Sequence, residues 1–235
     1  MRKLLFILVV ILPLIKSKAQ NLINNPSFES AITDTSIIFD FDNNFTCDYW
    51  TSPSKGSPDY YTSKRQGAYG APINRMGCQE PHSGIAYASF ICQKPVFEYV
   101  QVKLNQKLVK NQTYCLSLFI SPNNKGYYTS NEIDFALSNS EIHQNTEKCM
   151  NNVPHKKIIA TNGDFKINGW NQISSTYTAK GGEEFLILGL FNYAHKLKLS
   201  RNIKFEGFDY LCYYIDDVSL IAIQDTNECK CNTIT

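Results

Sequence analysis

The sequence predicts an all-β fold, an antiparallel β-sandwich of the jelly-roll type. Short segments in which apolar and polar residues alternate recur between residues 85 and 223, as in strands that place one face on a core. Residues typical of turns separate these segments, and no stretch keeps a 3.6-residue period over three turns. Setting residues 1–19 aside leaves 216 of the 235 residues, a length that suits a single all-β domain.

The alternation defines eight expected strands in chain order. They cover residues 85–91, 100–104, 114–120, 133–137, 157–161, 170–178, 185–191 and 213–223. The segment 185–191 is almost wholly apolar, which favours a strand covered on both faces. Three long segments, 31–80, 139–156 and 192–210, are rich in polar or aromatic residues and are expected to be loops. Loops of this length either carry function or wrap the scaffold, and both alternatives stay open.

Residues 1–19 have the pattern of a secretory signal peptide. Two basic residues precede an apolar run at residues 4–15, and Ser17-Lys18-Ala19 supplies the small residues that a signal peptidase reads. The run is too short for a transmembrane helix, which needs about 20 apolar residues. We therefore expect an exported protein (periplasmic, outer-surface or extracellular) with no membrane span. Its sandwich domain would cover residues 20–224, ahead of a short tail at 225–235.

The charge balance excludes one class of partner. The chain has 23 Lys and Arg against 21 Asp and Glu. The leader holds four of the bases and no acid, so 19 bases face 21 acids in the remaining chain and its net charge is about −2. This balance lacks the strong basic surface of a nucleic-acid-binding protein, and no nucleic-acid partner is expected.

All eight cysteines follow the leader. An even number of cysteines in an exported chain favours disulfides, so we expect two or fewer free thiols, with a pairing that sequence cannot choose. Cys115 lies inside an expected strand and also fits a buried thiol. Zinc is disfavoured because the closest cysteine pair, Cys229 and Cys231, has no histidine nearby.

Two motifs mark the ends of the domain. The first runs from Asn25 to Glu29 and the second from Tyr213 to Leu220. A sandwich can place its first and last strands side by side, which would bring the carboxylates of Glu29 and Asp216 together. Asp217 would leave the opposite face of the strand, because side chains alternate.

These motifs resemble those of carbohydrate-binding modules with the galactose-binding-like fold. Modules of this kind occur in secreted envelope proteins of Gram-negative bacteria, often ahead of an OmpA-like domain. The resemblance covers roughly residues 21–223, and its segments are 25–29, 50, 57–60, 77–79, 83–87, 108, 114, 181–183, 188–189 and 214–218. It implies a structural Ca²⁺ held by Glu29 and Asp216, since calcium prefers carboxylate and carbonyl oxygens. The chain departs from the family in its many cysteines and in having no OmpA-like domain, which leaves envelope tethering open.

A glycan-binding surface would combine aromatic faces with nearby hydrogen-bonding groups. The candidates in the expected loops are Asp59, Tyr60, Tyr61, Tyr69, Asn74, Arg75, Gln79, Tyr127, Tyr128 and Tyr193. For any single tyrosine, a place in the core is the competing interpretation.

The function that these features predict is non-catalytic binding of a glycan or cell-surface polysaccharide at the cell envelope. A structural or adhesive envelope protein that binds a protein partner is the second hypothesis. A hydrolase is the third. The sequence contains no nucleophile elbow, zinc-protease motif or phosphate-binding loop, and His82-Ser83-Gly84 is expected to be an ordinary loop. Paired carboxylates for glycoside hydrolysis stay open, because their separation is a property of the fold.

Overall fold

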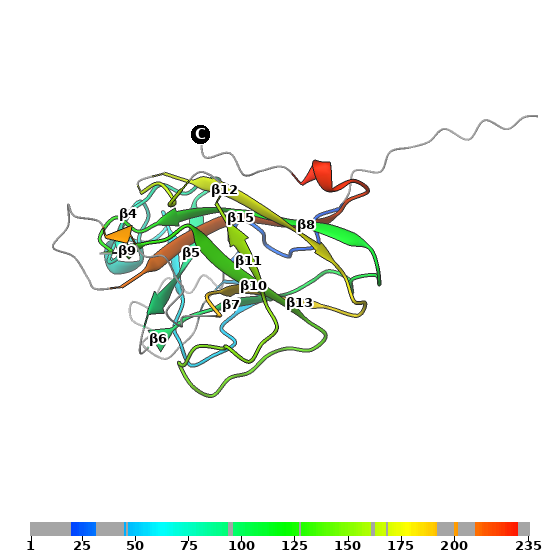
Figure 1. Ribbon diagram of the computed structural model, residues 1–235. Helices are drawn as coiled ribbons and strands as arrows, with labels where there is room; N and C mark the ends of the chain where they lie inside the picture. The colour runs from blue at the N-terminus through cyan, green and yellow to red at the C-terminus, as the bar shows by residue number, and fades with distance from the viewer. Residues whose placement is uncertain are drawn as a thin grey trace, which may run out of the picture.

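The computed structural model describes residues 20–31, 45, 47–93, 96–126, 128–160, 163–167, 169–191, 200–201 and 210–229. In these residues, two antiparallel sheets pack face to face (Figure 1). Two short 3₁₀ helices, η1 (Gly67–Tyr69) and η2 (Thr226–Glu228), are the only helices in these ranges, and neither is long enough to span a membrane. The predicted antiparallel β-sandwich is confirmed, while the predicted signal peptide lies outside the described residues.

The first sheet has five strands and the second has six. In spatial order the first contains β1 (Trp50–Thr51), β7 (Val100–Lys103), β13 (Phe185–Gly189), β10 (Glu132–Ser138) and β11 (Lys156–Ile159). The second contains β12 (Asn171–Thr178), β8 (Thr113–Pro122), β15 (Cys212–Ala222), β5 (Ala86–Gln93) and β2 (Asp59–Thr62), with β6 (Val96–Phe97) paired to β5. Two small ribbons pair β3 (Ile73–Asn74) with β4 (Gly77–Cys78) and β9 (Tyr128–Thr129) with β14 (Ser200–Arg201).

The main core lies between the two sheets. Alternate residues of β8, namely Leu116, Leu118 and Ile120, enter it, as do Leu186 and Leu188 of β13, and all five are fully buried. Each such side chain contributes about 1.5–3 kcal/mol when it leaves water. Residue 187 of β13 enters a second cluster on the outer face of the sheet, so the prediction that this segment is covered on both faces is confirmed.

The eight expected strands correspond to β5, β7, β8, β10, β11, β12, β13 and β15. The prediction of a loop from residue 31 to residue 80 is wrong in part, because it contains β1 to β4. Three of these strands have only two residues, too few to show a period. The remaining strand, β2, is buried along its whole length. It therefore lacks the alternation of buried and exposed residues by which a strand is recognised in a sequence.

The N-terminal segment runs beside the last strand, as the end motifs predict. The backbone N–H of Leu22 donates to the carbonyl of Leu220 at 2.9 Å, and that of Val218 donates to Pro26 at 2.9 Å. The side chain of Asn21 adds bonds to the same two residues of β15. Segments almost 200 residues apart in sequence are therefore hydrogen-bonded neighbours.

One disulfide, Cys115–Cys229, joins β8 to the residue after η2. Cys115 is therefore not the buried thiol that its strand position also allowed. Five other described cysteines are free, namely Cys47, Cys78, Cys92, Cys149 and Cys212. The prediction of at most two free thiols is wrong in this structure. Cys92 and Cys212 illustrate why: they lie on neighbouring strands but enter clusters on opposite faces of one sheet.

Candidate functional site

Asp216 holds the beginning of the turn at residues 82–86. The residue is fully buried, and its Oδ2 accepts the backbone N–H groups of His82 at 2.9 Å and Ser83 at 3.2 Å. Its Oδ1 accepts the N–H of Asp217 at 2.7 Å. Both oxygens of this carboxylate therefore have donors from the protein itself.

Glu29 holds the end of the same turn. Its Oε1 accepts the N–H groups of Ile85 at 3.0 Å and Ala86 at 3.2 Å, and Oε2 lies 3.2 Å from the N–H of Ile85. Gly84 has a φ of +60° and would place a Cβ against the carboxylate of Glu29, so glycine alone fits this approach without strain. The two end motifs meet through a turn that neither motif contains.

Asp217 also binds this turn, which corrects the expectation from strict strand alternation. A bulge interrupts the pairing of β15 with β8 between Asp216 and Ser219, and Asp217 has a φ of +47°. Its oxygens accept the hydroxyls of Ser27 at 2.5 Å and Ser83 at 2.7 Å, and lie 2.5 Å from Nδ1 of His82. Burial opposes ionisation, but these hydrogen bonds lower the pKa of Asp217 below its ordinary value.

The donors around Glu29 and Asp216 do not fit a calcium ion shared between the two carboxylates. Calcium needs six to eight oxygen ligands, whereas the carboxylate oxygens here face backbone N–H groups, whose positive ends repel a cation. No group of three or more His, Cys, Asp or Glu side chains in the described ranges could hold a metal ion. The end motifs thus predict a calcium site, whereas the backbone donors predict none, and melting of the protein with calcium and with a chelator decides between them.

The same cluster does not have the geometry of a hydrolytic triad. In such a triad, the nucleophilic hydroxyl donates to a histidine nitrogen, and a carboxylate orients the histidine. Here the hydroxyl of Ser83 donates directly to Asp217, while the ring of His82 stacks on Phe119 with 3.5 Å between centroids. Histidine therefore does not activate this serine.

A second group of predicted site residues forms a buried ion pair. Asp59, on β2, is 5 % exposed and receives Nη2 of Arg75 at 2.8 Å and the hydroxyl of Tyr61 at 2.8 Å. Burial raises the pKa of Asp59, and Arg75 opposes that shift. The guanidinium lies 5.4 Å from the ring centre of Tyr69. The structure brings these four residues together, but only Arg75 and Tyr69 retain exposed surface.

Asn74 and Gln79 are buried inside a hydrogen-bond network. The amide of Asn74 donates to the hydroxyl of Tyr87 at 2.9 Å and accepts from Tyr214 at 3.0 Å. The side chain of Gln79 accepts the hydroxyl of Ser121 at 2.8 Å. These bonds fasten the 63–80 segment over the outer face of the six-stranded sheet. These hydrogen bonds therefore give both amides a role in holding the fold together.

The remaining predicted tyrosines are divided. Tyr60 is buried in the main core, and Tyr128 packs against that core from β9. Tyr127 and Tyr193 lie outside the described residues. None of the predicted ligand residues in the described ranges lines the pocket described next.

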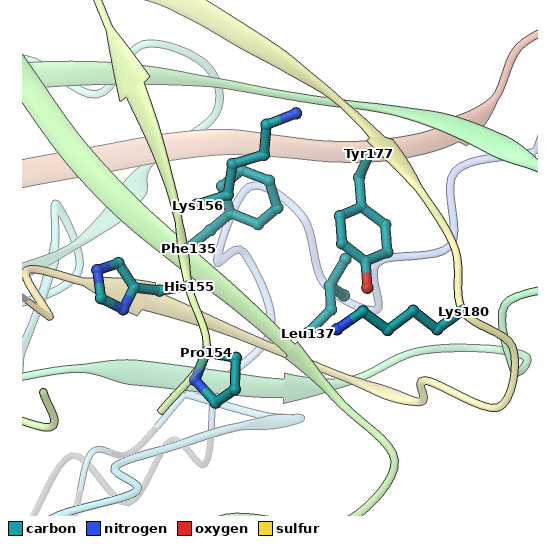
Figure 2. Close-up of a pocket in the computed structure, with 7 residues that line it drawn as sticks. All are labelled: Phe135, Leu137, Pro154, His155, Lys156, Tyr177 and Lys180. Atoms are coloured by element: carbon teal, nitrogen blue, oxygen red, sulfur yellow. The ribbon is translucent and has the colours of Figure 1, made fainter. Parts of the chain in front are cut away.

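An open pocket lies instead on the side of the sandwich where the edge strands β11 and β12 come together. Its volume is about 100 Å³. We call it the edge pocket; its lining residues are Phe135, Leu137, Pro154, His155, Lys156, Tyr177 and Lys180. Figure 2 shows the ring of Tyr177 between the side chains of Lys156 and Lys180, with Leu137 beside it.

Hydrogen bonds fix the ring of Tyr177 in this pocket. Its hydroxyl donates to Oε1 of Glu183 at 2.7 Å, and the backbone N–H groups of Lys180 and Gly181 donate to the same carboxylate at 2.7 and 2.8 Å. Burial opposes ionisation of Glu183, but these bonds lower its pKa below the ordinary value. The edge of the ring also packs on Phe135, with 6.3 Å between centroids. The pocket therefore presents an aromatic ring whose position is already set.

The edge pocket has no signature in the sequence because its lining residues come from three separate segments. Lys156 and Tyr177 lie on edge strands of different sheets, and which edges meet depends on the order of strands in space. One local signal was available: Gly181-Gly182-Glu183 follows an expected strand and predicts a tight turn. Both glycines have positive φ, +99° and +93°, and they let the chain return so that Glu183 reaches Tyr177.

No protein-family model and no curated protein matches this chain. Among solved structures, the CBM22-1 xylan-binding domain of Xyn10C from Paenibacillus barcinonensis is 10% identical, with a TM-score of 0.45 over 88% of this chain and 97% of that one. TmCBM61 in complex with β-1,4-galactotriose is 11% identical, with a TM-score of 0.41 over 87% of this chain and 100% of that one. The xylan-binding domain from CBM 22 is 13% identical, with a TM-score of 0.40 over 83% and 94%. These similarities are weak both in sequence and in superposition.

Proposed function

We propose that this chain binds glycans, without catalysis, through the edge pocket. The observation that carries the proposal is the ring of Tyr177, which lines an open pocket while its hydroxyl is bonded to Glu183. The apolar faces of sugar rings stack on aromatic rings of this kind. A ring that is fixed before binding loses little conformational entropy when the ligand arrives.

The polar groups around Tyr177 support the same function. Lys156 and Lys180 are exposed on either side of the ring and can donate hydrogen bonds to sugar hydroxyls. The pocket is smaller than the roughly 300–1,000 Å³ of drug-binding sites. A pocket of about 100 Å³ suits part of one sugar residue, at a chain end or a side branch.

We also propose that the chain is exported and acts at the cell envelope. The leader pattern at residues 1–19 supports export. The two end motifs, which resemble those of secreted envelope modules, support a role at the cell envelope as a partner of polysaccharide.

A glycan array with two variants tests the proposal. Wild-type protein should bind a defined set of glycans. Tyr177→Ala should lose that binding, whereas Tyr177→Phe, which keeps the ring, should retain most of it. Tyr49→Ala serves as the matched control, because Tyr49 is a tyrosine with 65% exposure outside the pocket. Thermal unfolding of each variant checks that the fold is intact.

Three results would contradict the proposal. Equal binding by wild type and Tyr177→Ala would place any glycan site elsewhere. The absence of binding across the array, together with a specific protein ligand, would favour the structural or adhesive hypothesis. Turnover of glycoside or ester substrates that a mutation in the pocket abolishes would favour a hydrolase.

A further inference from the structure

Two lysines approach the ring of Tyr177 from different elements. Lys156 is the first residue of β11, and Lys180 follows the end of β12. Figure 2 shows the side chain of Lys156 reaching toward β12 and that of Lys180 reaching toward Leu137 below the tyrosine hydroxyl. The ammonium group of Lys156 donates to the carbonyl oxygen of Thr176. The two positive charges thus flank one pocket.

In the residues that the structure describes, neither ammonium group is paired with a carboxylate. Lys157, one residue along β11, has Nζ 2.6 Å from Glu132, and Lys107 has Nζ 3.5 Å from Glu184. Within the described part of the chain, no ion pair joins Lys156 or Lys180 to an acidic residue. Lys156 has only a neutral carbonyl as its partner, so its charge stays available to a ligand.

The other titratable groups near the pocket do not reverse this balance. Glu183 is 2% exposed, and its oxygens already accept the hydroxyl of Tyr177 and two backbone N–H groups. His155 stacks on Phe191, with 5.3 Å between ring centres, and its Nδ1 lies 2.8 Å from the carbonyl of Val153. Its ring points away from Tyr177 in Figure 2. The accessible charges are therefore those of the two lysines.

We propose that the glycan bound in the edge pocket is anionic and carries a carboxylate or sulfate group on the sugar that stacks on Tyr177. This inference rests on the proposed function. The sugar ring covers the aromatic face, and its anionic group accepts hydrogen bonds from the ammonium groups of Lys156 and Lys180. Hydrogen bonds between charged groups are about twice as strong as neutral ones, so the acidic group would decide which glycans bind. The two lysines bring positive charge to this pocket, whereas residues 20–235 together have a net charge of about −2.

Affinity electrophoresis and calorimetry with two matched pairs of polysaccharides test the inference. The first pair is polygalacturonate and the same polymer with its carboxyl groups reduced to alcohols. The second is dextran sulfate and unmodified dextran. In at least one pair, the protein should bind the acidic polymer more tightly than the neutral one, by about tenfold or more. One hydrogen bond to a charged group corresponds to about this factor in affinity. This preference should weaken as salt is raised.

Variants connect the preference to the two lysines. Lys156→Gln and Lys180→Gln should each weaken binding to the acidic polymer, and the double variant should remove the preference for it. The double variant should keep any weak binding to the neutral polymer that depends on Tyr177. Lys64→Gln is the matched control, because Lys64 is exposed and follows β2, at the opposite edge of the sheet that contains β12. Its affinity should match the wild type.

The outcomes separate the two proposals. If wild type binds each acidic polymer no better than its neutral counterpart, the inference is wrong, and glycan binding through Tyr177 still stands. If Lys64→Gln weakens binding as much as the pocket variants do, the attraction is a general charge effect and the inference is wrong. If inorganic sulfate alone displaces the polymers at equal concentration of charge, the pocket binds free anions and the sugar plays no part. If no glycan binds at all, the proposed function itself fails.

Discussion

Two neighbouring aspartates of β15 have opposite electrostatic environments. Burial, and then the charge of Asp217, raise the pKa of Asp216 to about 8. Asp217 instead accepts two hydroxyls and lies beside His82, and its pKa is lowered. The fully buried carboxyl group of Asp216 and the partly exposed one of Asp217 bind the same 82–86 turn, and at neutral pH the pair favours a single negative charge.

Stability should fall as pH rises from about 5 to about 8, because several buried carboxyl groups, among them Glu98 and Asp216, have raised pKa values. Burial, and then the charge of Asp59, raise the pKa of Glu98 to about 8, matching Asp216. Unfolded carboxyl groups ionise near pH 4, so between about pH 4 and pH 8 the folded state binds more protons than the unfolded state. The free energy of unfolding therefore decreases with pH across this window.

Urea unfolding at about pH 5.5 and about pH 8 measures this slope. Glu98→Gln should reduce it, whereas Glu80→Gln, at an exposed position, should leave it unchanged. The lowered pKa of Asp217 has the opposite effect on stability. Its contribution begins to be lost only below about pH 4, where an aspartate in the unfolded chain becomes protonated. A free energy of unfolding that rises between the two pH values would contradict the raised pKa values.

At the scale of elements, a short 3₁₀ helix and a disulfide hold the C-terminal segment to the six-stranded sheet. The sequence pattern alone predicts neither this helix nor this cysteine pairing. Residues 225–229 begin the segment that the sequence predicts to be a short tail. In this segment η2 has a capping box between Asp225 and Glu228, and Cys229 is bonded to Cys115 of β8. The two cysteines pack with Ile223 in a small apolar cluster. This segment therefore covers one end of the sheet.

Loss of the disulfide should destabilise the protein markedly. The bond closes a loop across a sequence separation of 114 residues, and removing such a constraint from the unfolded chain costs about 2–4 kcal/mol. Cys229→Ser should show this loss in urea unfolding, and reduction of the wild type should reproduce it. Cys78→Ser, which alters an exposed free thiol, should change the free energy by less than about 0.5 kcal/mol. Equal stability of Cys229→Ser and wild type would contradict the bond.

At the scale of the whole molecule, the sequence predicts strands that are long enough to show an alternating pattern. It does not predict features that depend on contacts between distant segments. The strand β8 shows its alternation over ten residues, from Thr113 to Pro122, and was predicted. The strand β2 has four residues and none exposed, and was missed. Asn74 and Gln79 have the polarity of ligand-binding residues, but long-range partners bury them. The edge pocket forms only because β11 and β12 are the edges of two stacked sheets.

The meeting of the chain ends gives the last prediction. Glu29 and Asp216 fasten the N-terminal segment and the last strand to one turn through backbone N–H groups. Because these amides occupy the carboxylate oxygens, we expect the melting temperature to be the same with calcium and with a chelator. Glu29→Gln should lower the free energy of unfolding by about 1–3 kcal/mol in both conditions, since the amide NH2 group would replace an oxygen that accepts a backbone N–H of this turn. Glu80→Gln again provides the exposed control. A melting temperature that rises with calcium in the wild type, and not in Glu29→Gln, would instead establish the calcium site that the end motifs predict.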